Sequence, residues 1–405
     1  MTRLNAFTLA LKSLRHKPLA TSINLLLMAV GMAMMSFVLS VSRQFEDNAL
    51  RDAQGIDLVV GAKGSPLQLI LSSVYHIDIP TGNIPRAAQA QLEQNRMVKK
   101  VIPLALGDSY NGFRIVGTNT DYIAHYGGTL AQGKMFSAPL EAVFGAQAAA
   151  KANITLNGSF SGSHGMARGG DTHGDAPFTA VGILKPTGTV LDRLILTPVE
   201  SVWRVHEIAH GIDSHDKEEK DAMDEERELT ALLVQYASPL AAMMLPRAVN
   251  SQSELQAAQP AFESAKLFRM LGVGIDVLRG VAGIMLLSAA LSILVALYNA
   301  LEERKTDLAI LRTLGAPPSK LMLLLLTEGL LLAITGAALG WIAGHAAVEV
   351  LGRVLSDDQN LALSGLIVSP DEAWLALVAV GVGIAASLLP ALRAYRTDIA
   401  PTLAH

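Results

Sequence analysis

Two histidines four residues apart could together hold a zinc ion. The segment His206-Glu207-Ile208-Ala209-His210 fits the pattern H-E-x-x-H. On a helix this pattern turns both imidazoles to one side and leaves the glutamate as a general base. A catalytic zinc also needs a third ligand, and Asp213, His215 and Asp216 do not stand at the spacing of a zinc protease signature. A membrane metalloprotease is therefore an alternative that the pattern leaves open.

More histidines lie in two polar stretches that have no periodic apolar pattern. Residues 158–174 are rich in Gly, Ser and His, and residues 206–228 combine three histidines with a long charged run. Imidazoles among carboxylates can collect Zn²⁺ without any catalysis. An ordinary solvated loop has the same composition, so zinc binding is a hypothesis to be tested. The candidate metal ligands are His164, His173, His206, His210 and His215.

The chain has no phosphate-binding loop of its own. It contains no Gly-x-x-x-x-Gly-Lys-Ser/Thr segment, whose backbone amides would cradle a nucleotide. It contains no cysteine, so neither a disulfide nor a thiolate metal site can form. The net charge of −4 argues against a nucleic-acid partner, since such partners favour clearly basic proteins.

The most informative segment of the chain is a charged, partly apolar stretch at residues 302–320. Its apolar residues recur at helical spacing, Gly315 is expected to end the helix, and Pro317-Pro318 prevents its continuation. An amphipathic helix of this kind can lie in a groove on a partner protein or on a membrane surface. Its apolar face consists of Leu308, Ile310, Leu311 and Leu314.

Four long apolar runs predict that this helix lies beside a membrane. Hydrophobic residues make up 51% of the chain and charged residues only 17%, against about 25% charged residues in soluble domains. Each run reaches the roughly 20 residues that a bilayer-spanning helix needs. The first run exceeds the apolar core of a cleaved signal peptide, so we expect a retained anchor. The four transmembrane helices are predicted at residues 19–41, 276–301, 321–348 and 373–392.

The distribution of Lys and Arg predicts how the chain is oriented in the membrane. Basic residues gather in residues 1–18, 302–320 and 393–405, which are therefore expected to be cytoplasmic. Residues 349–372 carry one arginine against several carboxylates, so they and residues 42–275 are expected outside. Residues 1–18 are also predicted to form a short amphipathic helix on the inner leaflet, or a simple extension of the first span.

Residues 42–275 are numerous enough for one or two packed domains. Short β-like runs alternate there with helical stretches at residues 86–95 and 251–271, which predicts a mixed α+β domain between the first two spans. The second helical stretch is expected to continue into the second span as one stiff rod. Strands are predicted at residues 57–60, 98–106, 113–116, 178–184, 193–196 and 230–236.

Several of these segments together resemble the MacB/FtsX family of ABC permeases, also called type VII. Residues 13–19, 178–189, 390–394 and 398–401 are similar to family segments at the corresponding places. The segment after the second span is similar to the family pattern E-R-x-x-E/D-I-x-x-L-R-x-L-G-A, with Leu308 where the pattern has Ile. The residues that carry the resemblance are Glu303, Arg304, Asp307, Ile310, Leu311, Arg312, Leu314, Gly315 and Ala316.

The resemblance implies a permease that pairs with a second copy or a paralogue and works with two copies of a cytoplasmic ABC ATPase. ATP and Mg²⁺ would be bound by that ATPase, so this chain would be no enzyme and would hold no cofactor. A periplasmic adaptor or binding protein is a further expected partner, beside membrane lipid. The implied ATPase-coupling residues are Glu302, Glu303, Arg304, Asp307, Leu308, Leu311, Arg312, Leu314 and Gly315.

The third span contains a carboxylate and a ladder of glycines. Glu328 lies about two turns into the span, where a charge is costly unless it has a partner. We expect a polar contact between helices of the dimer there, or else an interfacial position. Gly336, Gly340 and Gly344 recur every four residues and would permit close helix packing.

The sequence therefore predicts the permease subunit of an ABC transporter in the bacterial inner membrane, with both termini cytoplasmic and residues 42–275 periplasmic. ATP hydrolysis by the partner would drive movement of the periplasmic domain, for efflux or for handling lipoproteins, peptides or other envelope substrates. A zinc-linked permease and a scaffold that controls cell-wall hydrolases are the alternatives beside the protease. Either direction of transport is compatible with these residues, as are a homodimer and a heterodimer.

Overall fold

The fold is that of a computed structural model, which describes residues 6–165, 176–209, 227–252, 254–313, 315, 317–358 and 363–396. The chain divides into two compact units. The helical unit comprises Met1–Phe45, Leu271–Asp357 and Leu361–His405, and the second unit consists mainly of Glu46–Met270.

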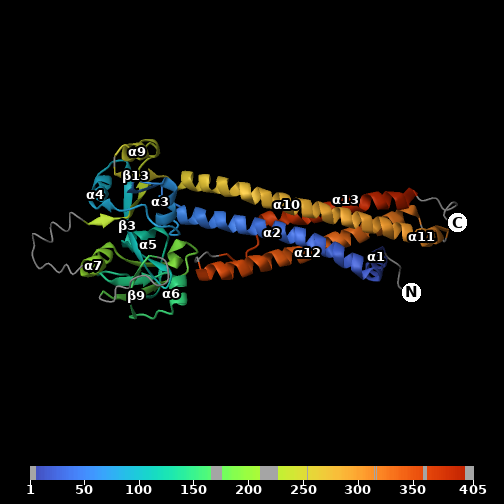
Figure 1. The fold of residues 1–405 in the computed structure, drawn as a ribbon, viewed down its shortest axis with the longest axis horizontal. Helices are drawn as coiled ribbons and strands as arrows, with labels where there is room; N and C mark the ends of the chain where they lie inside the picture. Colours follow the sequence, from blue (N-terminus) through green and yellow to red (C-terminus); the bar gives the residue numbers. More distant parts are fainter. Residues whose placement is uncertain are drawn as a thin grey trace, which may run out of the picture. The chain divides into compact units, whose positions relative to one another are not determined.

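Long helices that run side by side form the helical unit (Figure 1). Within the described residues, four helices are long and apolar enough to cross a membrane, as predicted. They are α2 (Pro18–Ala53), α10 (Pro260–Glu303), α12 (Pro318–Asp358) and α13 (Ala373–Arg396). The shorter α1 (Ala6–His16) and α11 (Lys305–Thr313) precede α2 and α12, and a 3-10 turn, η2 (Pro370–Glu372), leads into α13.

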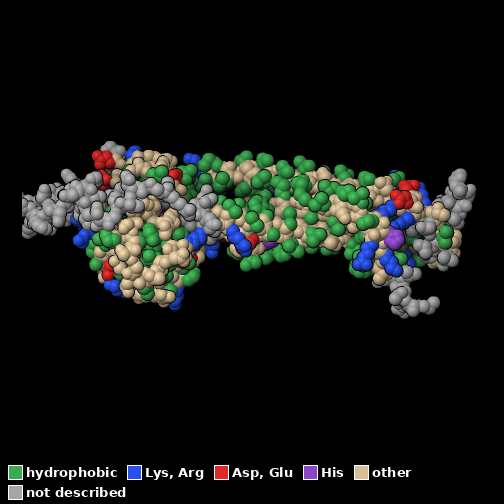
Figure 2. Space-filling view, turned by 60° about the horizontal axis from the view of Figure 1, so that its bottom comes forward, with side chains coloured by type: hydrophobic (Ala, Val, Ile, Leu, Met, Phe, Trp, Pro, Cys, Tyr) green, Lys and Arg blue, Asp and Glu red, His purple; other side chains and the backbone are tan. Residues whose placement is uncertain are grey.

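Hydrophobic side chains cover most of the bundle face seen in Figure 2. Leu377 in the second turn of α13, for example, is 73% exposed. A soluble protein rarely exposes an apolar surface that extends over whole helices, whereas lipid tails are as apolar as leucine. The bundle is therefore built to lie in a bilayer.

Helix α12 is longer than the predicted third span, so the connection predicted at residues 349–372 begins in a helix, and its periplasmic position stays a prediction. The helix continues to Asp358. Glu349 accepts a hydrogen bond from Arg353 Nε at 3.2 Å, one turn later. Pairs of opposite charge at this spacing stabilise a helix, so the end of the apolar run does not end the helix.

Helix α12 packs closely against α2 through the predicted glycine ladder. A Cβ atom added to Gly336 would lie 2.7 Å from Met28 Cβ, and one added to Gly340 would lie 2.4 Å from the backbone oxygen of Ala29. Gly344 meets the same helix. These contacts join two helices of one chain, and a contact with a second permease copy stays a prediction.

The second unit is built on a sheet of eleven strands among the described residues. The main path runs β13-β1-β12-β3-β4-β10-β6-β9-β5, antiparallel except for the β4–β10 and β6–β9 pairs. All six predicted strands are present. The path consists of β1 (Leu58–Ala62), β3 (Val98–Tyr110), β4 (Phe113–Thr118), β5 (Leu130–Gly133), β6 (Glu141–Phe144), β9 (Phe178–Leu184), β10 (Leu194–Pro198), β12 (Ala231–Tyr236) and β13 (Leu255–Ala258).

The remaining strands are short, and two of them lie in a predicted loop. Off the main path, β7 (Ser159–Phe160) pairs with β9 and β8 (Ser163–His164) pairs with β3, so residues 158–174 begin with regular structure. A separate pair joins β2 (Ile84–Pro85) to β11 (Glu228–Leu229).

Helices cover the sheet and enclose its hydrophobic cores. Leu69 and Ile70 pack with Val59 in one core, and Val199 and Val202 pack in another. This arrangement confirms the predicted mixed α and β domain. The helices are α3 (Pro66–Ser73), α4 (Ala87–Glu93), α5 (Thr120–His125), α6 (Ala146–Ala152), the 3-10 turn η1 (Val190–Arg193), α7 (Val199–Ala209) and α9 (Ala241–Asn250).

The helix predicted over residues 251–271 is wrong in its first part. Leu255–Ala258 is strand β13, which pairs antiparallel with β1. Helix α10 begins only at Pro260, where a proline is favoured because the first helical N–H has no partner in the helix. Pairing with a neighbouring strand has overridden the local preference of this segment.

Replacing Gly340 with alanine should push α2 and α12 apart and lower the melting temperature of the purified protein. The added Cβ would meet a backbone oxygen, which cannot swing away as a side chain does. Overpacking of this kind costs about 1–3 kcal/mol. Gly381→Ala in α13 is the matched control, since no atom lies within 4 Å of its Cβ position. Equal melting temperatures for the two variants would contradict the close packing.

Candidate functional site

The candidate site lies where α10 breaks into α11, in the segment that the sequence singles out. Arg304 forms a turn between the two helices. Helix α11 ends at Thr313, and Gly315 follows with a φ angle of +95°. Glycine adopts this conformation without the strain that a Cβ atom would cause. Helix α12 then begins at Pro318, so glycine and proline stand where the chain reverses.

The side chain of Arg304 ties this break to two other helices. Its Nη1 donates a hydrogen bond to Ser13 Oγ of α1 at 2.5 Å. The same nitrogen lies 3.7 Å from Glu328 Oε1 of α12, a distance at which charges attract but no hydrogen bond forms. We call Ser13, Arg304 and Glu328 the clasp. All three belong to the helical unit.

Glu328 depends on this partner, because its side chain is only 2% exposed. A carboxylate removed from water costs several kcal/mol unless a cation lies beside it. Removing one partner of a buried pair typically costs about 3–5 kcal/mol, since the other charge is left uncompensated. The structure thus places Glu328 in a contact within one chain, and its predicted dimer contact stays a prediction.

Two ion pairs at the surface flank the clasp. The ammonium of Lys17, which directly precedes α2, is bonded to Glu303, and Lys305 pairs with Glu302. These side chains are between 33% and 60% exposed, so each pair contributes little to stability. The Lys17–Glu303 pair nevertheless joins the N-terminal segment to the end of α10, as the Ser13–Arg304 hydrogen bond does.

A second polar cluster holds the segment between α12 and α13. His345 Nδ1 lies 2.7 Å from the backbone oxygen of Gly365, and Nε2 lies 2.7 Å from Glu372 Oε2. Since the carbonyl oxygen only accepts, the N–H of Nδ1 donates the first of these hydrogen bonds. Trp341 donates to the same carboxylate oxygen at 2.6 Å. The Gln44 side chain of α2 exchanges two hydrogen bonds with the backbone N–H and C=O of Ser364, which directly precedes Gly365.

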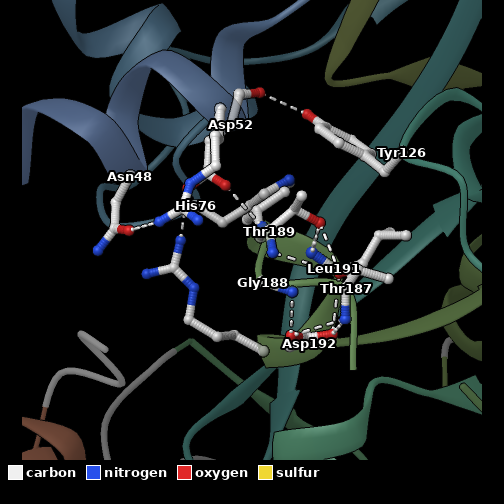
Figure 3. A network of polar contacts seen from close by, with 12 residues as sticks. Asn48, Asp52, His76, Tyr126, Thr187, Gly188, Thr189, Leu191 and Asp192 are labelled. Carbon is white, nitrogen blue, oxygen red and sulfur yellow. Dashed lines mark hydrogen bonds and ion pairs between the residues drawn. The ribbon is translucent and has the colours of Figure 1, made fainter. Parts of the chain in front are cut away.

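In the second unit, a buried polar network holds the last turn of α2 (Figure 3). Asp52 Oδ1 accepts a hydrogen bond from the backbone N–H of Val190 at 2.7 Å, and Oδ2 accepts one from Arg193 at 2.9 Å. The Tyr126 hydroxyl donates to the backbone oxygen of Asp52 at 2.7 Å. Because η1 directly precedes β10, these bonds fasten α2 to the part of the sheet around β10 and β4.

Comparison with known protein families decides the identity of this architecture. Residues 21–263 match the family described as MacB-like periplasmic core domain, and residues 279–399 match the family described as FtsX-like permease C-terminal. The chain belongs to the MacB/FtsX family of ABC permeases. It is a multi-pass inner-membrane protein with a mixed domain between its first two spans, as predicted.

Two curated relatives of this permease match part of its sequence. Lipoprotein-releasing system transmembrane protein LolC of Neisseria meningitidis serogroup B is 30% identical over 131 residues, which cover 29% of this chain and 32% of LolC. LolC of Xylella fastidiosa is 27% identical over 157 residues, which cover 35% of this chain and 38% of LolC. The chain thus spans about a third of the length of the curated relatives it matches.

Two solved structures also resemble the permease at 13% sequence identity. The periplasmic region of MacB from Actinobacillus actinomycetemcomitans covers 54% of this chain and 95% of its own length, with a TM-score of 0.34. The extracellular domain of the ABC-type transporter YknZ from Gram-positive bacteria covers 50% of this chain and 99% of its own length, with a TM-score of 0.31.

The structure brings only some of the predicted coupling residues of the permease together. Glu302, Glu303 and Arg304 lie at the clasp and its two ion pairs. Ile310 of α11 is 46% exposed, and Gly315 ends the segment. Arg312 lies in the last turn of α11. The side chains of Asp307, Leu308 and Leu311, and residue Leu314, lie outside what the structure describes.

Sequence reasoning missed Ser13 and Lys17 as partners of this segment. A buried carboxylate in the third span and an arginine at the end of the second could have suggested a pair between Glu328 and Arg304. No comparable signal points to Ser13, because a serine in an amphipathic helix is usually only part of its polar side.

The predicted metal ligands fall largely outside the described residues. Among the residues that the structure describes, no group of three or more His, Asp or Glu could hold a metal ion. His164 ends β8 and His206 lies in α7, so the predicted 206–228 loop begins inside a helix, but the side chains of both are not described. His173, His210 and His215 lie outside the described ranges. Zinc binding and the protease alternative therefore stay predictions.

His76 is a further buried titratable group of the second unit, beside Asp52, that Figure 3 shows. It is 5% exposed, and its Nε2 is hydrogen-bonded to the Tyr122 hydroxyl at 2.9 Å. Burial lowers the pKa of His76 well below its ordinary value, and the positive charges of Arg114 and Arg193 lower it further. The fold therefore holds a neutral imidazole here.

Acidification below about pH 6.5 should destabilise the permease through His76, because the unfolded chain then binds the proton that the buried imidazole rejects. The free energy of unfolding should fall by up to about 1.4 kcal/mol per pH unit. Asparagine tolerates the positive φ of this position (54°), so His76→Asn should flatten the dependence. The measurement is denaturant unfolding at pH 7, 6 and 5, and an unchanged slope in the variant would refute this role.

Proposed function

We propose that this permease converts ATP hydrolysis by a separate cytoplasmic ATPase into movement of the domain between its first two spans. Helix α11 would dock on the ATPase, and the clasp would pass its displacement to α1 and α12. The clasp carries the proposal, because one half-buried arginine at the start of the docking helix joins it to both of these helices.

The long helices supply a physical route for that movement. Helices α2 and α10 each contribute residues to both units without a break. At 1.5 Å rise per residue, the 44 residues of α10 extend over about 65 Å. A displacement at the α10–α11 break would therefore reach the other end of α10 as a shift of the whole helix.

The two helices are fastened to different places in the second unit. Asp52 near the end of α2 is bonded to η1. Ser264 in the first turns of α10 is hydrogen-bonded to the Tyr75 hydroxyl, just after α3, at 2.6 Å. A shift of one helix past the other would act on two separate parts of the sheet and so change the shape of the domain.

The nucleotide chemistry would belong to the partner. The chain contains no phosphate-binding loop, so ATP and Mg²⁺ would be held by two ATPase copies. A second permease copy or a paralogue would complete the assembly. The termini and α11 would face the cytoplasm, and residues 42–275 the periplasm.

An envelope lipoprotein is the first candidate cargo, because both curated relatives are named for lipoprotein release. The same mechanics also suit efflux and peptide handling, in which a periplasmic adaptor or binding protein would receive the movement.

Reversing the charge of Arg304 (Arg304→Glu) should lower the stimulated ATPase rate of the purified permease–ATPase complex by at least about tenfold while the chain still inserts. The charge swap Arg304→Glu with Glu328→Arg should restore part of the rate, because it forms the pair again. The measurement is ATP turnover in lipid nanodiscs.

Arg353→Glu is the control for this experiment. Its side chain is 78% exposed and pairs with Glu349, one turn earlier on α12, so the rate should stay within twofold of the wild type. A wild-type rate in Arg304→Glu would contradict the coupling role of the clasp.

A further inference from the structure

Helix α1 buries only one edge of its apolar side. Ala10 is fully buried, and Leu14 packs against the core of the helical unit. Phe7 and Leu11, one turn apart on the adjoining edge, are 51% and 37% exposed. The described part of the protein therefore leaves half of this apolar stripe uncovered.

Cations border the uncovered edge. Lys12 and Arg15 are exposed, and Arg15 follows Leu11 by one helical turn. The sequence has no acidic residue before Glu46. Figure 2 shows Lys and Arg side chains gathered over the end of the bundle where α1 lies. An apolar edge beside cations is complementary to a surface of acyl chains and phosphates.

The position of α1 in the chain favours a bilayer as the occupant. Only Lys17 separates α1 from α2. Leu19 and Ile23 in the first turns of α2 are 75% and 47% exposed, and they begin the apolar surface of the first span. The exposed edge of α1 therefore continues a surface that already needs lipid.

We propose that α1 binds the surface of acidic phospholipids, with Phe7 and Leu11 among the acyl chains and Lys12 and Arg15 at the phosphates. This goes beyond the coupling proposal, because it holds for the permease without its ATPase. Ser13, on another side of the same helix, is bonded to Arg304. The head-group composition of the membrane would thus bias the position of the α10–α11 break.

Single spin labels can test this contact, since the chain contains no cysteine. Nitroxides at Phe7→Cys and Leu11→Cys are compared with one at His16→Cys on the polar side, in the full chain. The vesicles contain phosphatidylethanolamine alone or mixed with phosphatidylglycerol. We expect the labels at 7 and 11 to collide more often with oxygen, which dissolves in the bilayer, than with a water-soluble nickel complex. Phosphatidylglycerol should strengthen this preference. The label at 16 should collide more often with the nickel complex. Nickel access at 7 and 11 equal to that at 16, or shielding from both reagents, overturns the proposal.

Charge removal tests the choice of acidic lipid. Lys12→Gln with Arg15→Gln, in the chain labelled at Phe7→Cys, should abolish the effect of phosphatidylglycerol. Removing one cation should lower the ratio of membrane-bound to unbound helix about fivefold, so removing both should lower it roughly 30-fold. Lys266→Gln with Arg269→Gln is the matched control, since it removes two exposed cations of the second unit. An effect that survives the first pair, or is lost equally in the second, overturns the proposal.

Discussion

A carboxylate buried among apolar helices is tolerated only beside a positive charge, and Glu328 has Arg304 at 3.7 Å. This requirement fixes the end of α10 against α12. The hydrogen bond from Arg304 to Ser13 then adds α1 to the same point. Three helices far apart in the sequence are thus held together at the turn from which α11 begins.

Close packing explains why a displacement of the clasp would be transmitted to the neighbouring helices. Gly340 leaves no room for even a methyl group between α12 and α2, and close-packed side chains transmit strain because they leave few voids. The cluster around His345 ties the other end of α12 to the segment before α13. The helical unit is therefore braced at both ends of α12, and α2 and α10 continue from it into the second unit.

The sequence predicts the spans and the strands because apolar runs and alternation are properties of neighbouring residues. It does not predict strand β13, since Leu255–Ala258 becomes a strand only by pairing with β1. It identifies Glu328 and Arg304 separately, by residue type and position. It cannot identify Ser13, whose partner lies 291 residues away and leaves no periodic pattern.

The second unit offers the most direct test of the coupling account, because the account requires the nucleotide to change a distance within this unit, far from where the nucleotide would bind. Spin labels at Leu240 beside α9 and Ala150 in α6, both exposed sites of the second unit, would report that distance by pulsed electron resonance in the permease–ATPase complex. The account predicts a shift in the distance distribution between the nucleotide-free and vanadate-trapped states, and no shift in Arg304→Ala. A shift of the same size in Arg304→Ala would contradict it.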